Sequence, residues 1–175
     1  MLVVFGGLPG TGKTTLARQV ADRLGATYLR IDAIEQALRS SMGLGEDVGP
    51  AGYVIAYAIG EANLALGRAV VADCVNPLPV TRAAWRDVAA TAAVPIVEIE
   101  VICSDEAEHR RRVEGRETDI PGLIAPSWAA VVARDYEPWS EPRMVVDTAH
   151  LTSAEAVAAI VDAVQRRSSG PSNLS

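Results

Sequence analysis

Residues 7–14 have the residue types and spacing of a phosphate-binding loop, G-x-x-x-x-G-K-[ST]. The glycines allow positive φ angles, so main-chain N–H groups can converge on phosphate oxygens. Lys13 is expected to reach the β- and γ-phosphates of a nucleotide, and Thr14 to hold Mg²⁺. Thr15 either contacts an inner phosphate or is an ordinary residue at a helix N-terminus. The predicted cradle consists of Gly7, Leu8, Pro9, Gly10, Thr11, Gly12, Lys13, Thr14 and Thr15.

Two aspartates follow apolar runs of strand length. The run AVVAD, residues 69–73, has the form of a Walker B strand, so Asp73 is expected to bind Mg²⁺ directly or through water. An alternative is that Asp73 is an N-cap or turn acid. The run ATYLRID ends at Asp32, whose carboxylate could accept a proton from an attacking hydroxyl group. Asp32 could instead cap the helix that follows it.

The segment 109–116, HRRRVEGR, is the densest cationic stretch of the chain. Arg112 and Arg116 are four residues apart, so we expect them to share one face of a helix beside a flexible loop. Such an arginine can stabilise charge on a transferring phosphoryl group. The remaining cations of the segment, His109 included, are expected to lie on a solvated helix face.

Alternating strand-like and helix-like segments must position these residues. We expect strands at 2–6, 26–32, 69–73, 95–103 and 143–148, and helices at 13–24, 33–41, 53–66, 80–91, 105–114, 128–136 and from 152 or 153 onward. Ser104 is expected to cap the helix at 105–114. Such alternation predicts a parallel sheet with helices on both faces and a ligand site at the carboxyl ends of its strands.

Composition narrows the possible functions. The 175 residues are expected to form one domain, and the net charge of −6 argues against binding to long nucleic acid or to an anionic membrane. No apolar run is long enough to span a bilayer, and the chain begins with a strand rather than a leader, which predicts a cytoplasmic protein. Cys74 and Cys103 have no metal-ligand spacing and are expected to be buried thiols.

Taken together, the cradle, the two aspartates and the arginine segment resemble the small P-loop kinases. This group includes chloramphenicol phosphotransferase, polynucleotide 5′-kinase domains, zeta toxins, gluconate kinase, shikimate kinase and adenylylsulfate kinase. The resemblance extends over residues 1–167, which we expect to form a single domain, with a disordered tail at 168–175. It implies a three-layer α/β P-loop NTPase fold with a five-stranded parallel sheet of order 2-3-1-4-5 and a short lid at about 112–140.

The same resemblance implies ATP and Mg²⁺ as the phosphate donor. By this likeness Asp32 deprotonates the acceptor hydroxyl group, and Arg112 and Arg116 stack on adenine and contact the phosphates. Thr148, after the fifth strand, would flank the base.

We therefore expect transfer of the γ-phosphate of ATP to a hydroxyl group of a small molecule, either a metabolite or an antibiotic. Alternatives are a nucleotide or polynucleotide 5′-kinase, and a regulatory or assembly ATPase with no small-molecule acceptor. Asp32 favours an enzyme, because a switch needs no acceptor base. The expected acceptor contacts are Asp32, Arg39, Tyr53, Tyr57, Asp73 and Asn76. Trp85 could add to the wall of the acceptor pocket or be an ordinary core or surface aromatic. Arg82 could hold an anionic acceptor or be a solvated arginine on a helix.

Overall fold

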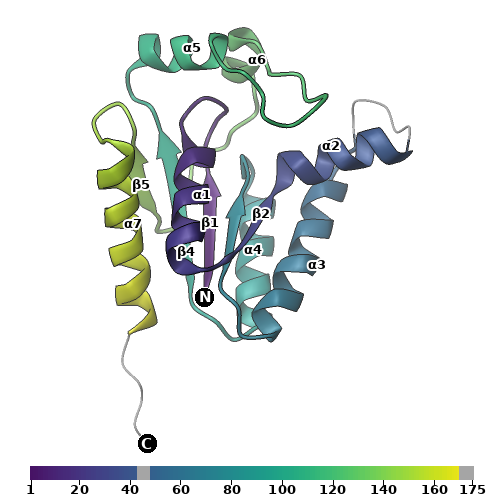
Figure 1. The fold of residues 1–175 in the computed structure, drawn as a ribbon, viewed down its shortest axis with the longest axis vertical. Coiled ribbons are helices and arrows are strands. Elements are labelled where there is room, and N and C mark those ends of the chain that lie inside the picture. The colour runs from purple at the N-terminus through teal and green to yellow at the C-terminus, as the bar shows by residue number, and fades with distance from the viewer. Residues whose placement is uncertain (43–47, 170–175) are drawn as a thin grey trace, which may run out of the picture.

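The computed structural model describes residues 1–42 and 48–169, which form a five-stranded sheet flanked by helices (Figure 1). The strands are β1 (Leu2–Gly6), β2 (Thr27–Arg30), β3 (Val70–Asp73), β4 (Ile96–Ile102) and β5 (Met144–Asp147). All paired strands are parallel, in the order β2-β3-β1-β4-β5, which confirms the predicted topology. The helices are α1 (Lys13–Leu24), α2 (Ile31–Met42), α3 (Ala51–Ala65), α4 (Pro79–Thr91), α5 (Glu106–Glu114), α6 (Trp128–Val132) and α7 (Ser153–Ser168).

Two apolar cores lie on opposite faces of the sheet. Val3 and Phe5 of β1 pack with α1 and α7, whereas Leu2 and Val4 pack with α3 and α4. Every residue of β1 is buried because helices cover both faces, which explains its uninterrupted apolar sequence. The three layers hold the carboxyl ends of the strands at one edge, where the cradle leaves β1.

Several predicted boundaries were wrong in ways that affect the site. Strand β2 ends at Arg30 and α2 begins at Ile31, so Asp32 lies in the first turn of a helix rather than at the end of a strand. Helix α5 ends at Glu114, so Arg116 lies beyond it and shares no helix face with Arg112.

Two further corrections concern the ends of helices. Asp105, not Ser104, caps α5, and its side chain accepts a hydrogen bond from the main-chain N–H of Glu108 at 3.0 Å. The predicted disordered tail begins too early, because Ser168 is the last residue of α7. The rest of that prediction, from 170 onward, lies outside the described residues, as does the 43–47 part of the expected loop between α2 and α3.

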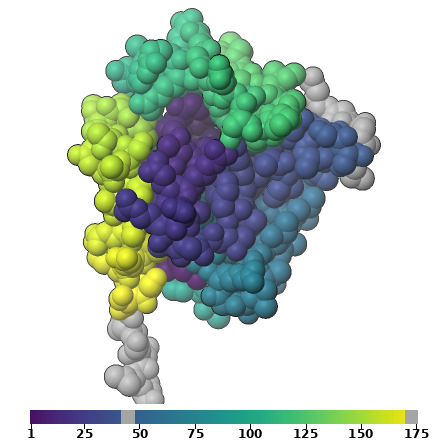
Figure 2. All heavy atoms as spheres, viewed as in Figure 1, coloured from purple at the N-terminus to yellow at the C-terminus, as the bar shows by residue number. Residues whose placement is uncertain are grey.

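A layer formed by α5, α6 and the connection between them lies across the carboxyl edge of the sheet, above α1 and the cradle (Figures 1 and 2). We call the connection, residues 115–127, the lid loop. None of the helices in the described ranges is long and apolar enough to cross a membrane.

Arg82 of α4 ties the segment that follows α6 to the body of the protein. Its side chain is 2% exposed, and its guanidinium carbon lies 4.2 Å from the ring centroid of Trp139. Its nitrogens donate to four main-chain carbonyl oxygens, at 2.6–3.1 Å, of Asn76, Pro77, Glu137 and Pro138. Because it is fully engaged by the protein, Arg82 is not placed to hold an anionic acceptor, and that prediction was wrong.

Substituting Arg82→Met is expected to lower the free energy of unfolding by about 3 kcal/mol, because four main-chain carbonyl groups lose a charged donor. Chemical denaturation followed by circular dichroism measures this loss. Arg166→Met is the matched control, since Arg166 is exposed and, among the described residues, pairs with Asp162 on the same helix. Its removal is expected to change stability by at most about 0.5 kcal/mol. Equal effects of the two substitutions would contradict the anchoring role of Arg82.

Candidate active site

The cradle between β1 and α1 has the backbone geometry of a phosphate-binding loop. Gly7, Gly10 and Gly12 have φ angles of 140°, 85° and 91°. A Cβ atom at Gly7 would lie 2.3 Å from the carbonyl oxygen of Val101, so only glycine fits there. Gly12 occupies the N-cap position of α1 and has no side chain to cover the first-turn N–H groups. Those groups, together with the helix dipole, favour an anion at this position.

A hollow of about 470 Å³ opens beside the N-terminus of α1, and we call it the donor hollow. Its lining contains more basic than acidic residues, and the basic ones are Lys13, Arg18, Arg30, Arg111, Arg112 and Arg116. Thr14 and Thr15 line it as well, together with the acids Glu117 and Asp119. Its charge and its place at a helix N-terminus suit a polyphosphate.

Helix α5 is docked on the cradle. His109 is 7% exposed, and its Nε2 lies 2.8 Å from the carbonyl oxygen of Pro9, so the prediction of a solvated surface histidine was wrong. The His109 ring also contacts the ring of Trp128 of α6 edge-on, with centroids 5.1 Å apart. A Cβ atom at Gly10 would lie 2.5 Å from Cγ2 of Val113, which shows how closely α5 approaches.

The substitution Gly10→Ala is therefore expected to force α5 away from the cradle. The positive φ angle costs about 1–2 kcal/mol for a residue with a Cβ atom, and the steric overlap adds about 1–3 kcal/mol. Gly25→Ala separates the two effects, because Gly25 has a φ angle of 57° but nothing within 4 Å of its Cβ position. Thermal unfolding should show the larger loss for Gly10→Ala. A loss of stability no larger than that of Gly25→Ala would show that α5 moves away from the added Cβ atom at no energetic cost.

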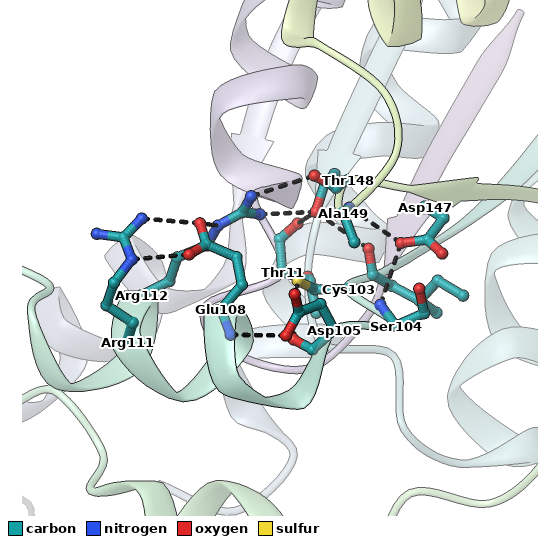
Figure 3. A network of polar contacts seen from close by, with 11 residues as sticks. Thr11, Cys103, Ser104, Asp105, Glu108, Arg111, Arg112, Asp147, Thr148 and Ala149 are labelled. Carbon is teal, nitrogen blue, oxygen red and sulfur yellow. Dashed lines mark hydrogen bonds and ion pairs between the residues drawn. The ribbon is translucent and has the colours of Figure 1, made fainter.

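Arg112 and Thr148 fix the cradle from the other side (Figure 3). Arg112 donates to Oγ1 of Thr148 at 2.8 Å and to its carbonyl oxygen at 3.1 Å, and it also pairs with Glu108 at 2.7 Å. The Thr148 hydroxyl in turn donates to the carbonyl oxygen of Thr11 at 2.8 Å. These contacts link α5, the end of β5 and the cradle, whereas contact of either side chain with adenine stays a prediction.

A second hollow of about 480 Å³ adjoins the first, and we call it the acceptor hollow. Three of the predicted acceptor contacts line it, namely Asp32, Arg39 and Tyr53. Lys13 and Arg116 line both hollows, so these two cations lie where donor and acceptor would meet.

The other predicted acceptor contacts do not line the acceptor hollow. Tyr57 and Trp85 pack edge-on in the core between α3 and α4, with ring centroids 4.6 Å apart, and Trp85 is fully buried. Trp85 therefore does not wall the acceptor pocket. Asn76 is fully buried with a φ angle of 51°, and its main-chain N–H donates to the Tyr53 hydroxyl at 2.9 Å.

Asp73 lies behind the donor hollow rather than on its surface. It is 2% exposed, and its Oδ2 accepts a hydrogen bond from the Tyr28 hydroxyl at 2.7 Å. Burial, with the nearby Asp73 carboxylate, raises the pKa of Tyr28, which keeps this hydroxyl a donor. In residues 1–42 and 48–169 no group of three or more His, Cys, Asp or Glu side chains is arranged to hold a metal ion. Thr14 lines the donor hollow, and its role in holding Mg²⁺ stays a prediction.

Sequence reasoning missed part of the acceptor hollow. Glu35 and Gln36 of α2, Arg134, and residues 122–126 of the lid loop also line it. Burial, followed by repulsion from Asp32, raises the pKa of Glu35 above its usual value. The spacing of three residues between Asp32 and Glu35 could have indicated a shared helix face. The resemblance implied a lid at about 112–140, but it did not indicate that residues 122–126 line this hollow.

An ion-pair cluster at the mouth of the donor hollow was also missed. Arg30 donates through Nη1 to both carboxylate oxygens of Asp119 in the lid loop, at 2.9 and 3.0 Å. Arg18 of α1 pairs with the same carboxylate. The hydrogen bond from Arg30 is the main reason that the pKa of Asp119 falls to about 2. The lid loop is thereby joined to α1 and β2.

Comparison with known proteins identifies the type of fold. The profile of the AAA_33 family, described as an AAA domain, matches residues 2–122, which is more than half of the chain. No curated protein sequence matches the chain.

Solved structures similar to this one include Kti12 from Chaetomium thermophilum in complex with ADP-AlF3, with a TM-score of 0.71 at 20% identity over 97% of this chain and 100% of that one. A gluconokinase from Sinorhizobium meliloti has a TM-score of 0.64 at 21% identity over 95% and 92% of the two chains. The Mycobacterium tuberculosis APS kinase CysC, in complex with AMPPNP and APS, has a TM-score of 0.62 at 20% identity over 94% and 96%. At these identities the likeness establishes the fold.

Proposed function

The chain belongs to the AAA_33 family and has the fold of the small P-loop kinases, and from this premise we propose that it transfers the γ-phosphate of ATP to a hydroxyl group of a small molecule. One observation carries the proposal: the cradle's donor hollow and the hollow that holds Asp32 share Lys13 and Arg116. A phosphoryl group moving between two bound molecules needs such a junction, with cations at the point of transfer.

Each residue has a definite task in this reaction. Asp32 accepts the proton of the acceptor hydroxyl while that oxygen bonds to the γ-phosphorus. The bond from the γ-phosphorus to the β,γ-bridging oxygen breaks, and Lys13 stabilises the negative charge on the departing ADP. Arg116 stabilises the charge spread over the transferring group. Thr14 would hold Mg²⁺, which would neutralise negative charge on the nucleotide phosphates. Asp73 contacts Tyr28 and Arg30 and has no direct part in the transfer.

The acceptor hollow supports a small molecule rather than a polymer. Its volume of about 480 Å³ lies within the usual range of small-ligand sites, about 300–1,000 Å³. Apolar side chains from Ile31, Val75 and the lid loop share its wall with Asp32, Glu35 and Arg39. A compact molecule with a hydroxyl group and an apolar portion suits this lining.

A panel of hydroxyl-bearing metabolites and antibiotics tests the proposal. Each compound is incubated with the protein, ATP and Mg²⁺, and ADP formation is compared with the rate in water alone. A true acceptor raises ADP formation, and mass spectrometry then finds it phosphorylated. A broad panel that yields only the rate seen in water, and no phosphorylated compound, would contradict a small-molecule kinase.

A second candidate is a nucleotide-dependent switch with no small-molecule acceptor. The similarity to Kti12, which was solved with ADP-AlF3, supports nucleotide binding, which both candidates share. This candidate predicts slow hydrolysis that a protein partner alters and that Asp32→Asn leaves unchanged. The presence of Asp32 in a hollow shared with Lys13 favours the kinase.

A further inference from the structure

Arg30 is a buried cation between the lid loop and the two aspartates Asp32 and Asp73. Its side chain is 4% exposed, and Nη1 is bonded to Asp119. On the other side, Nε lies 3.9 Å from a carboxylate oxygen of Asp32 and 3.9 Å from one of Asp73. Pairing in the sheet places Arg30 beside Asp73, and Asp32 follows two residues later. One guanidinium group therefore faces three carboxylates from three different segments.

The hydrogen bonds of this guanidinium are incomplete. Within the described ranges, Nε and Nη2 are buried and have no hydrogen-bond partner. A buried charged donor without a partner is costly, so the group is poised to take any acceptor that a small movement allows. The two carboxylates at 3.9 Å are such acceptors, because a shift of about 1 Å would bring either within the usual hydrogen-bond distance of about 2.9 Å.

Resting on the proposed function, we propose that Arg30 is a positioning residue that makes Asp32 available only when the lid loop is closed. When the lid loop is closed, Nη1 of Arg30 donates to Asp119, and the carboxylate oxygens of Asp32 are free to accept the proton of the acceptor hydroxyl group. When the lid loop withdraws Asp119, the guanidinium turns to Asp32 and Asp73 and donates to them. Asp32 is then drawn from the acceptor hollow, and transfer to water or to a misplaced acceptor is suppressed.

The exposed variant Asp119→Asn tests this directly. A crystal structure of the variant is expected to show a nitrogen of Arg30 within about 3 Å of a carboxylate oxygen of Asp32. Arg30 remaining at its present separation from Asp32 would overturn the proposal. This readout requires neither turnover nor a known acceptor, so it is independent of the outcome of the acceptor panel.

Kinetics supply a readout that a merely structural role would not change. ADP formation with water as acceptor is expected to fall about tenfold in Asp119→Asn, while the Kd for AMPPNP changes by less than about threefold. In an Arg30→Met background, Asp119→Asn should have no further effect, because no guanidinium is left to capture Asp32. Effects that multiply in the double variant would overturn the proposal.

Two matched controls separate capture of Asp32 from general loss of charge. Glu114→Gln removes a carboxylate from an exposed ion pair of α5 and is expected to leave ADP formation unchanged. Arg18→Met removes the other cation bonded to Asp119 but is half exposed and does not pair with Asp32. Asp119→Asn should therefore still lower the rate in an Arg18→Met background. Loss of the effect there would assign the coupling to Arg18 and overturn the role of Arg30.

Discussion

Replacing Asp32 by asparagine is expected to lower phosphoryl transfer to the acceptor by about 10³-fold, because a general base of this kind contributes about 10²–10⁴-fold. The amide has nearly the same shape as the carboxylate and cannot take the proton of the attacking hydroxyl group. Asp32 lines the acceptor hollow and not the donor hollow. The Kd for ATP should therefore change by less than about threefold, so that the loss appears in kcat.

Steady-state kinetics with the acceptor found in the panel, together with calorimetric titration of AMPPNP, measure the two quantities. Asp22→Asn is the matched control, because it makes the same chemical change at an exposed position of α1. It should leave both kcat and nucleotide affinity unchanged. Normal turnover in Asp32→Asn would remove Asp32 as the base and would favour the nucleotide-dependent switch.

The donor side of the site could be predicted from the sequence because its information is local. Gly7, Gly10 and Gly12 are needed by the backbone of one short loop, and Lys13 and Thr14 follow it directly. Strand order also followed from the resemblance, and alternating apolar segments placed each strand within a few residues. The family match and the strand order confirm the P-loop kinase resemblance.

The rest of the site depends on contacts between distant segments, which no periodic pattern records. Arg30 and Asp119 are 89 residues apart, and their pairing exists only because the lid loop crosses the edge of the sheet. His109 looked like a surface cation on a charged helix, but docking of α5 on Gly10 buries it. Asp32 was assigned to a strand end because ATYLRID has the length and pattern of a strand, yet α2 begins without a break after Arg30.

Lys13→Met is expected to abolish nucleotide binding and turnover together without reducing the stability of the free protein. Lys13 is 4% exposed, and in residues 1–42 and 48–169 no carboxylate lies within ion-pair distance of its ammonium group. The ammonium group borders the two hollows without a carboxylate partner in the described part of the chain, so replacing Lys13 by methionine keeps the apolar stem and removes no stabilising ion pair. In the nucleotide complex the ammonium group pairs with the β- and γ-phosphates. Its removal therefore weakens nucleotide binding without lowering the stability of the free protein.

Thermal unfolding with and without AMPPNP separates the two states. The wild-type Tm should rise with ligand concentration, because a ligand that binds only the folded protein stabilises it by RT ln(1 + [L]/Kd). The Lys13→Met protein should start at an equal or higher Tm and show no rise. Lys13 is the only lysine in the chain, so selective isotope labelling of lysine gives one NMR signal that reports phosphate binding directly. A variant that still gains stability from AMPPNP, or a wild-type lysine signal that AMPPNP leaves unmoved, would show that the phosphates bind elsewhere than in the cradle.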